Sequence, residues 1–221
     1  MNESEKIPVY FVPGLAANTR IFDHIVLPNK YEKVLLEWLS PESLDETIED
    51  YAKRMAMQVE NPNGILIGVS FGGVMVQEMK AFLTPKKVII ISSIKSRQEM
   101  PRRMYISQKT NAHKIIPNLT QDDIEKFEKY AITDWGKHKL HLYKKYFKVK
   151  DRNYLPWSFH TIMNWNRINP DPDIIHIHGT SDGVFPFKYI NNCIEIPKGT
   201  HVMILNKAKQ INKVLDGILN D

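Results

Sequence analysis

Short apolar segments alternate with amphipathic segments along most of this chain. Six runs of mostly apolar, β-prone residues predict strands, and they cover residues 7–12, 33–38, 64–69, 87–92, 174–178 and 193–196. The runs are apolar throughout instead of alternating with polar residues, which is typical of parallel strands that are covered on both faces. We therefore predict a doubly wound, mostly parallel α/β sheet of about six strands.

Helical spacing follows several of these strands. Ser43 and Glu46 match a capping box, and apolar residues at helical spacing continue from Ile48 to Val59. A second helix follows the third strand and is expected to end near residue 83, and a last helix is expected over residues 201–219. Helices between parallel strands supply the layers that cover the two faces of such a sheet.

The alternation stops between residues 94 and 169, where no strand pattern interrupts a series of helical patterns. The expected helices cover residues 102–115, 120–131, 135–147 and 159–167. A proline-rich stretch over residues 169–172 then returns the chain to the sheet. We predict one structural domain, with a core formed by residues 1–93 and 170–221 and a helical insertion over residues 94–169.

The segment Gly68-Val69-Ser70-Phe71-Gly72 joins the third strand to the helix that follows it. A serine in a G-x-S-x-G turn between a strand and a helix is the context of a nucleophile elbow. The turn is so tight that the serine adopts a strained backbone, and the flanking glycines remove side chains that would collide. By itself the pattern also fits a glycine-rich turn with a capping serine, so the assignment depends on partners elsewhere in the chain.

An aspartate and a histidine follow the last two predicted strands. Asp182 lies in the loop after the fifth strand, and His201 lies in the loop after the sixth. In a parallel α/β sheet, ligands bind beyond the carboxyl ends of the strands. Ser70, Asp182 and His201 also follow the chain order expected when an elbow serine is the nucleophile. Asp171 and Asp173 precede the fifth strand and are expected at the opposite edge of the sheet.

These residue types suit nucleophilic catalysis. A serine hydroxyl attacks only when a base takes its proton, and His201 is the candidate base because imidazole as a class titrates near neutral pH. Asp182 would hold the second ring nitrogen and stabilise the imidazolium. Taken singly, Asp182 also fits a turn residue and His201 a helix cap.

Four segments together resemble the α/β-hydrolase superfamily: residues 12–15, the elbow around Ser70, the loop from His178 to Pro186, and Gly199-Thr200-His201. The resemblance extends over nearly the whole chain except the insertion, which occupies the place of the family's variable cap. It implies that the backbone N–H groups of Leu15 and Phe71 form an oxyanion hole. Two features depart from the family pattern. Its usual His-Gly after the first core strand is Pro13-Gly14 here, and its leading antiparallel hairpin is absent, which predicts a reduced sheet.

Other candidate sites have simpler explanations. His176 and His178 share one strand face, but no further metal ligands stand at a suitable spacing, so no metal site is predicted. Ser92 and Lys95 match S-x-x-K, but they follow a strand and lack the partner motifs of that signature. An aromatic cluster near the end of the insertion fits either a helical core or the lining of an acyl pocket. Its members are Trp157, Phe159, Met163 and Trp165.

Composition limits the partners and the cellular compartment that we expect for this protein. The 221 residues carry a formal net charge of +5, and much of the excess lies in residues 137–148, where helical spacing favours a solvated basic helix face over a nucleic-acid surface. No apolar run is long enough to span a bilayer. The polar N-terminus is unlike a signal peptide, and the single cysteine, Cys193, cannot form an internal disulfide, so we expect a cytoplasmic protein.

The sequence thus predicts a serine hydrolase that cleaves a small carboxylic ester or thioester through an acyl-enzyme on Ser70, without a metal or organic cofactor. A carbon–carbon lyase or synthase of the same fold is an alternative, because such enzymes can keep the triad. A ligand-binding member without catalysis is a third hypothesis, although binding alone has no need of Asp182 and His201 together. The substrate and the oligomeric state stay open at this stage.

Overall fold

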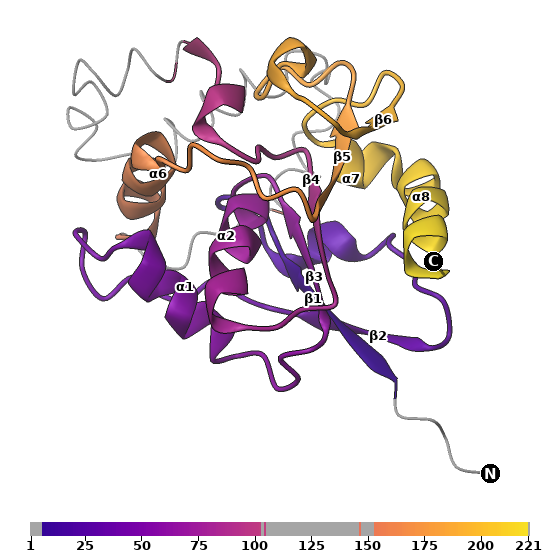
Figure 1. The fold of residues 1–221 in the computed structure, drawn as a ribbon, viewed down its shortest axis with the longest axis horizontal. Helices are drawn as coiled ribbons and strands as arrows, with labels where there is room; N and C mark the ends of the chain where they lie inside the picture. Colours follow the sequence, from indigo (N-terminus) through magenta and orange to yellow (C-terminus); the bar gives the residue numbers. More distant parts are fainter. Residues whose placement is uncertain (1–5, 103, 105–145, 147–152, 221) are drawn as a thin grey trace.

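A six-stranded parallel sheet forms the centre of the molecule (Figure 1). The computed structural model describes residues 6–102, 104, 146 and 153–220. Neighbouring strands follow the order β2-β1-β3-β4-β5-β6, and every pair is parallel. The strands are β1 (Ile7–Val12), β2 (Tyr31–Leu35), β3 (Ile65–Val69), β4 (Lys87–Ile91), β5 (Ile174–Gly179) and β6 (Ile194–Ile196). The predicted fold class is confirmed.

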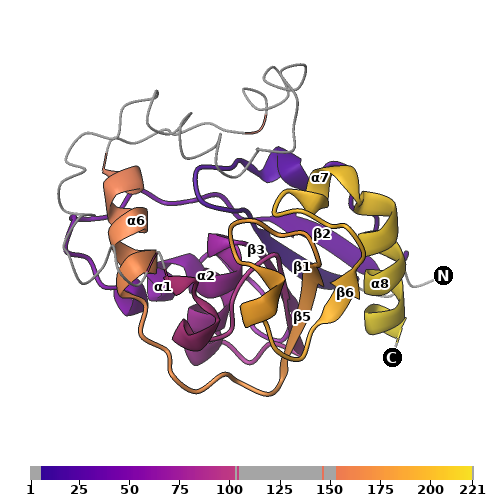
Figure 2. The same cartoon turned by 90° about the horizontal axis from the view of Figure 1, so that it is seen from above.

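Helices cover both faces of this sheet. The described helices are α1 (Ile48–Ala56), α2 (Phe71–Met79), α6 (Tyr154–Asn164), α7 (Met203–Asn206) and α8 (Ala208–Asn220). Short 3-10 turns lie at η1 (Thr19–Phe22), η2 (Lys80–Phe82), η3 (Arg97–Glu99) and η6 (Phe187–Tyr189). Figure 2 shows α1, α2 and α6 on one side of the sheet and α7 and α8 on the other.

Side chains of the strands alternate between two apolar layers. In β1, Tyr10 and Val12 pack in the cluster that includes α1 and α2, whereas Val9 and Phe11 pack in the cluster that includes α7 and α8. Successive residues of a strand point to opposite faces, so a strand covered on both sides must be apolar at every position. This two-sided burial explains why the strand patterns in the sequence were continuous.

The strand order reverses its direction at β1. The chain passes from β1 to β2 on one side and then crosses to β3 on the other side of β1. Loops that leave two neighbouring strands in opposite directions open a crevice at the carboxyl edge of the sheet. The loop after β1 and the turn after β3 therefore meet beside this crevice.

The capping residue of α1 differs from the predicted one. The helix begins at Ile48, and the side chain of Thr47 accepts the N–H of Asp50 at 3.1 Å. Glu46, the expected partner of Ser43, instead binds the guanidinium of Arg54 at 2.9 Å. The carboxylate of Glu46 is therefore paired with Arg54 instead of capping the helix with Ser43. The helix starts at Ile48, one turn later than predicted.

Three other boundaries also differ. The second strand was expected over residues 33–38 and covers Tyr31–Leu35. The N–H of Leu36 still donates to the carbonyl of Phe11 in β1, and the strand ends there. The helix expected over residues 159–167 is Tyr154–Asn164, because a proline at position 156 is tolerated within a first helical turn. The last helix is divided into α7 and α8 at Lys207, whose φ of −120° is not helical.

Most of the predicted insertion lies outside the described residues. The helices expected over residues 102–115, 120–131 and 135–147 fall there almost entirely, so the division into core and insertion stays a prediction. The described part shows the chain leaving the sheet after β4 and returning through α6 to β5. Among the helices that the structure describes, none combines the length and the apolar character needed to cross a membrane.

Candidate active site

Ser70 lies in the turn between β3 and α2 and has a φ of 54° and a ψ of −119°. Its N–H donates to the carbonyl of Ile91 at 2.9 Å, and its own carbonyl accepts the N–H of Gly73 at 2.9 Å. The hydroxyl of Ser93 also donates to that carbonyl at 2.7 Å. These three hydrogen bonds hold the serine in its uncommon conformation at the end of the strand.

His201 connects Ser70 to Asp182. Its Nε2 lies 2.9 Å from the Oγ of Ser70, and its Nδ1 lies 2.9 Å from Oδ2 of Asp182. An ionised carboxylate can only accept, so Nδ1–H donates to Asp182 and Nε2 accepts the hydroxyl proton of Ser70. The structure therefore brings together the three side chains that the sequence had placed in three separate loops.

Asp182 is buried, and both of its carboxylate oxygens accept hydrogen bonds. Its Oδ1 accepts the N–H groups of Val184 at 2.8 Å and Phe185 at 2.9 Å, while Oδ2 faces His201. Burial pushes the pKa of this carboxyl upward, but the charge and hydrogen bond of His201, together with the other donors, hold it below its usual value. The carboxylate is therefore ionised and oriented at neutral pH.

His176 and His178 form a buried pair behind Asp182. Nε2 of His178 donates to the carbonyl of Phe185 at 2.9 Å, so its Nδ1 is left to accept from Nε2 of His176 at 3.1 Å. Burial lowers the pKa of both imidazoles, well below the ordinary value for His176. Sequence reasoning had considered these histidines only as metal ligands. Their position six and four residues before Asp182, on the strand that leads into its loop, was the signal for a structural role there.

The two predicted oxyanion donors flank Ser70. Phe71 is the first residue of α2, and the first N–H groups of a helix have no partner within it. Leu15 lies in the loop after β1, where a Cβ built on Gly14 would lie 3.5 Å from the Cβ of Ser70. The positive end of the α2 dipole also points to this place, which favours negative charge.

The other candidate residues that the sequence offered do not take part in the arrangement around Ser70. Asp171 binds Lys80 at 2.7 Å at the other edge of the sheet. Lys95 is buried and donates to the carbonyls of Asn191 at 2.7 Å and Asn192 at 3.1 Å, so its ammonium group is engaged away from the hydroxyl of Ser92. Within the described residues, no group of three or more His, Cys, Asp or Glu side chains could hold a metal ion.

The two tryptophans of the aromatic cluster are part of the core. Trp157 is fully buried and donates its indole N–H to the carbonyl of Glu46 at 2.9 Å. Trp165 donates to the carboxylate of Glu78 at 2.9 Å. Indoles that are buried and satisfied by the framework fit the helical-core interpretation better than the acyl-pocket interpretation.

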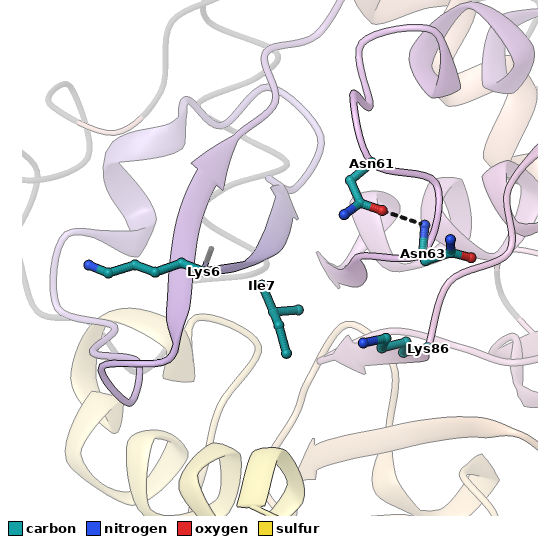
Figure 3. Close-up of a pocket in the computed structure, with 5 residues that line it drawn as sticks. All are labelled: Lys6, Ile7, Asn61, Asn63 and Lys86. Atoms are coloured by element: carbon teal, nitrogen blue, oxygen red, sulfur yellow. Dashed lines mark hydrogen bonds between the residues drawn. The ribbon is translucent and has the colours of Figure 1, made fainter. Parts of the chain in front are cut away.

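A cavity of about 350 Å³ lies at the opposite, amino-terminal edge of the sheet (Figure 3). It is lined by Lys6, Ile7, Asn61, Asn63 and Lys86. None of the residues described above as surrounding Ser70 contributes to it. This cavity is therefore separate from the site around Ser70.

Comparison with known proteins shows the fold. No protein-family model and no curated protein matches the sequence. A thermophilic esterase from Thermogutta terrifontis has a TM-score of 0.71 at 11% identity, over 98% of this chain and 90% of the esterase. A hydrolase from Pseudomonas aeruginosa PA01 has a TM-score of 0.71 at 11% identity, over 100% and 92%. A Bacillus megaterium epoxide hydrolase has a TM-score of 0.70 at 12% identity, over 100% and 96%. The molecule has the α/β-hydrolase fold.

Proposed function

We propose that this protein is a serine hydrolase that cleaves a carboxylic ester or thioester. The observation that carries the proposal is the continuous chain of hydrogen bonds from Ser70 through His201 to Asp182, with both distances at 2.9 Å. A nucleophile, a base and a residue that orients the base, each within hydrogen-bond reach of the next, form the arrangement that activates a serine hydroxyl.

In the first half of the reaction, Oγ of Ser70 bonds to the carbonyl carbon of the substrate while its proton passes to Nε2 of His201. Asp182 stabilises the resulting imidazolium through Nδ1–H. The negative oxygen of the tetrahedral intermediate accepts the N–H groups of Leu15 and Phe71, and removing one such donor typically costs about 3 kcal/mol. When the intermediate collapses, the bond to the alcohol or thiol breaks and the leaving group takes the proton from Nε2.

In the second half, water replaces the leaving group. Its oxygen bonds to the acyl carbon while Nε2 of His201 takes one of its protons. The second tetrahedral intermediate then releases the carboxylic acid, and the proton returns from Nε2 to Oγ of Ser70. Apart from water, every group used in these steps belongs to this chain or to the substrate.

We assign the choice of acyl and alcohol groups to residues 94–169. The chain leaves the sheet at the carboxyl end of β4, on the same edge as Ser70, and returns through α6. Because ligands bind beyond the carboxyl ends of the strands, an insertion that begins at this edge is our candidate for the segment that determines which substrate fits.

The decisive experiment is labelling with a fluorophosphonate, followed by mass mapping of the modified peptide. We expect covalent modification of Ser70, none in Ser70→Ala and sharply reduced modification in His201→Ala. Turnover of p-nitrophenyl esters and of acyl thioesters of increasing chain length should fall about 10⁵-fold or more in Ser70→Ala. Asp182→Asn should lower kcat about 10⁴-fold, since the imidazole loses the group that fixes its tautomer.

Ser92→Ala is the matched control. Ser92 follows the neighbouring strand, is buried, and has a hydroxyl with no hydrogen-bond partner among the described residues. The Ser92→Ala variant should be labelled at Ser70 and should turn over esters as the wild type does. A folded protein that is not labelled at Ser70 would overturn the nucleophile assignment. Labelling at Ser70 with no turnover of any ester or thioester would overturn the hydrolase assignment and favour a lyase of the same fold.

A further inference from the structure

One tryptophan outside the three catalytic loops contacts the proposed oxyanion hole. Trp38 follows β2, and its indole Nε1–H donates to the carbonyl of Gly14 at 3.1 Å. The same carbonyl accepts the N–H of Ala17 at 3.1 Å. Gly14 therefore has a carbonyl oxygen that is held from two directions.

This carbonyl belongs to the same peptide group as the N–H of Leu15. A peptide group is planar, and in its trans form the C=O and the N–H point in opposite directions. No cis peptide bond occurs in the described residues. Two donors that fix the oxygen of Gly14 thus also fix the direction of the Leu15 N–H. That N–H makes no hydrogen bond to any other residue that the structure describes, so it is available to a ligand.

The loop needs such an anchor because its own backbone does not favour one orientation. Gly14 has no side chain to resist rotation of this peptide. The next residue but one, Ala16, has a φ of 59°, which a residue with a side chain rarely adopts. A loop with these features can exchange between peptide orientations unless outside contacts select one.

Trp38 is itself held in place by aromatic neighbours. Its ring stacks on Phe71 with centroids 5.3 Å apart and an interplanar angle of 22°. Further rings lie at 5.5 Å in Tyr154 and 6.2 Å in Tyr51. One indole thus contacts both the residue that carries one proposed donor, Phe71, and the peptide that carries the other, Leu15.

We propose that Trp38 is a positioning residue, whose indole N–H orients the Leu15 N–H toward the oxyanion formed on Ser70. The inference rests on the proposed hydrolase function. It assigns Trp38 no contact with the substrate, and it predicts an effect on the transition state instead of on substrate binding. Its energetic contribution must be smaller than that of the donor it positions, because the bond from Ala17 stays in place.

The test compares Trp38→Phe with Trp157→Phe. Phenylalanine keeps an aromatic ring at position 38 and removes only the indole N–H and part of the ring area. Trp157 is the matched control, since its indole also donates to a carbonyl, that of Glu46 at 2.9 Å, and it stacks on Tyr51 with centroids 4.1 Å apart. The control therefore loses the same kind of bond from the same aromatic cluster, at a carbonyl outside the site.

For Trp38→Phe we expect kcat for p-nitrophenyl acetate to fall about tenfold to thirtyfold, below the 10²- to 10³-fold cost of removing a whole donor, with KM within about twofold. For the matching thionoacetate, kcat should fall much less in Trp38→Phe, because the sulfur anion that develops in its transition state is a weak acceptor of hydrogen bonds from these N–H groups. The ester-to-thionoester rate ratio should thus fall in Trp38→Phe and stay at the wild-type value in Trp157→Phe. An equal ratio in all three proteins, or an equal fall in both variants, would overturn the inference.

A second readout does not depend on hydrolysis. In ¹⁵N–¹H spectra, the Leu15 amide should shift or broaden in Trp38→Phe and keep its wild-type position in Trp157→Phe. An unchanged Leu15 resonance in Trp38→Phe would also overturn the role of Trp38. If the wild type is neither labelled at Ser70 nor active on esters, the proposed function fails, and the amide spectrum alone decides whether Trp38 orients this peptide.

Discussion

Ser70 is held in a backbone conformation that residues with a side chain rarely adopt. Its φ of 54° and ψ of −119° lie in a region that favours glycine. The conformation persists because Ile91, Gly73 and Ser93 each form a hydrogen bond with its backbone. The strained conformation places Oγ 2.9 Å from Nε2 of His201, so local stability and the placement of the proposed nucleophile are in conflict at this residue.

Replacing this serine by glycine should therefore stabilise the fold relative to alanine. Glycine relieves a strain of about 1–3 kcal/mol and loses about 0.5–1 kcal/mol to the greater freedom of the unfolded chain. We expect Ser70→Gly to be more stable than Ser70→Ala by about 1 kcal/mol in urea unfolding. Both variants lack Oγ, so neither should hydrolyse esters. A Ser70→Ala protein as stable as Ser70→Gly would show that the elbow is not strained.

At the scale of elements, the turn between β3 and α2 is pressed against the loop after β1. A Cβ added to Gly72 would lie 2.3 Å from the carbonyl oxygens of Val12 and Pro13. A Cβ added to Gly68 would lie 2.2 Å from the carbonyl oxygen of Gly72. These neighbours are backbone atoms that cannot rotate away. The strand, the helix and the loop after β1 therefore fit together only with glycine at both positions.

Gly72→Ala should destabilise the protein by about 3 kcal/mol or more, because relief of the overlap requires α2 to move away from β1. Gly217→Ala is the control. Gly217 lies in α8, and a Cβ there meets no atom within 4 Å. We expect this exposed helical site to gain about 0.5–1 kcal/mol from alanine. Urea unfolding measures both changes, and a Gly72→Ala protein as stable as the wild type would contradict the close contact.

At the scale of the whole molecule, a row of ionisable groups, buried except for His201, joins the core of the sheet to the edge that carries the candidate active site. It runs from His176 through His178 to Asp182 and His201. Burial lowers the pKa of His176 well below its ordinary value, and the nearby charges of His178 and Lys95 add to the effect. In the folded state these two imidazoles are therefore neutral at a pH where free histidine is already protonated.

The lowered pKa of the buried histidines makes the folded state less stable as the pH falls. Below a pH of about 6.5 the unfolded chain binds protons at histidine that the folded chain does not bind, so stability falls as the pH falls. The lowered pKa of Asp182 acts in the same direction, but only below the carboxyl pKa of the unfolded chain, about 3.9. Between pH 6.5 and 5 the buried histidines are therefore the main source of this dependence within the row.

We expect the Tm of the wild type to fall by about 4 °C per pH unit for each such histidine between pH 6.5 and 5. His176→Gln should flatten this fall, because glutamine can still donate to Nδ1 of His178 but does not titrate. His24→Gln is the control, since it makes the same substitution at an exposed histidine outside the row, and the flattening should be larger in His176→Gln. The same steep slope in His176→Gln as in the wild type would show that His176 is not held neutral by burial.

The sequence by itself determined the parallel sheet, the elbow around Ser70 and the loops that hold Asp182 and His201. These features are encoded locally, because two-sided burial makes a strand apolar throughout and a tight turn selects glycine. The chain order of the three residues, combined with the rule that ligands bind at the carboxyl ends of strands, was enough to expect them together.

Only the tertiary structure decided which more distant groups support them. Trp38 was expected at the end of a strand, and its bond to Gly14, 24 positions away, follows from how β2, the loop after β1 and α2 pack. The same holds for the histidine pair, whose bonds to each other and to Phe185 depend on the path of one buried loop. Short-range sequence patterns indicate whether a residue is buried. Which residue it packs against or hydrogen-bonds to depends on how whole strands, helices and loops are placed.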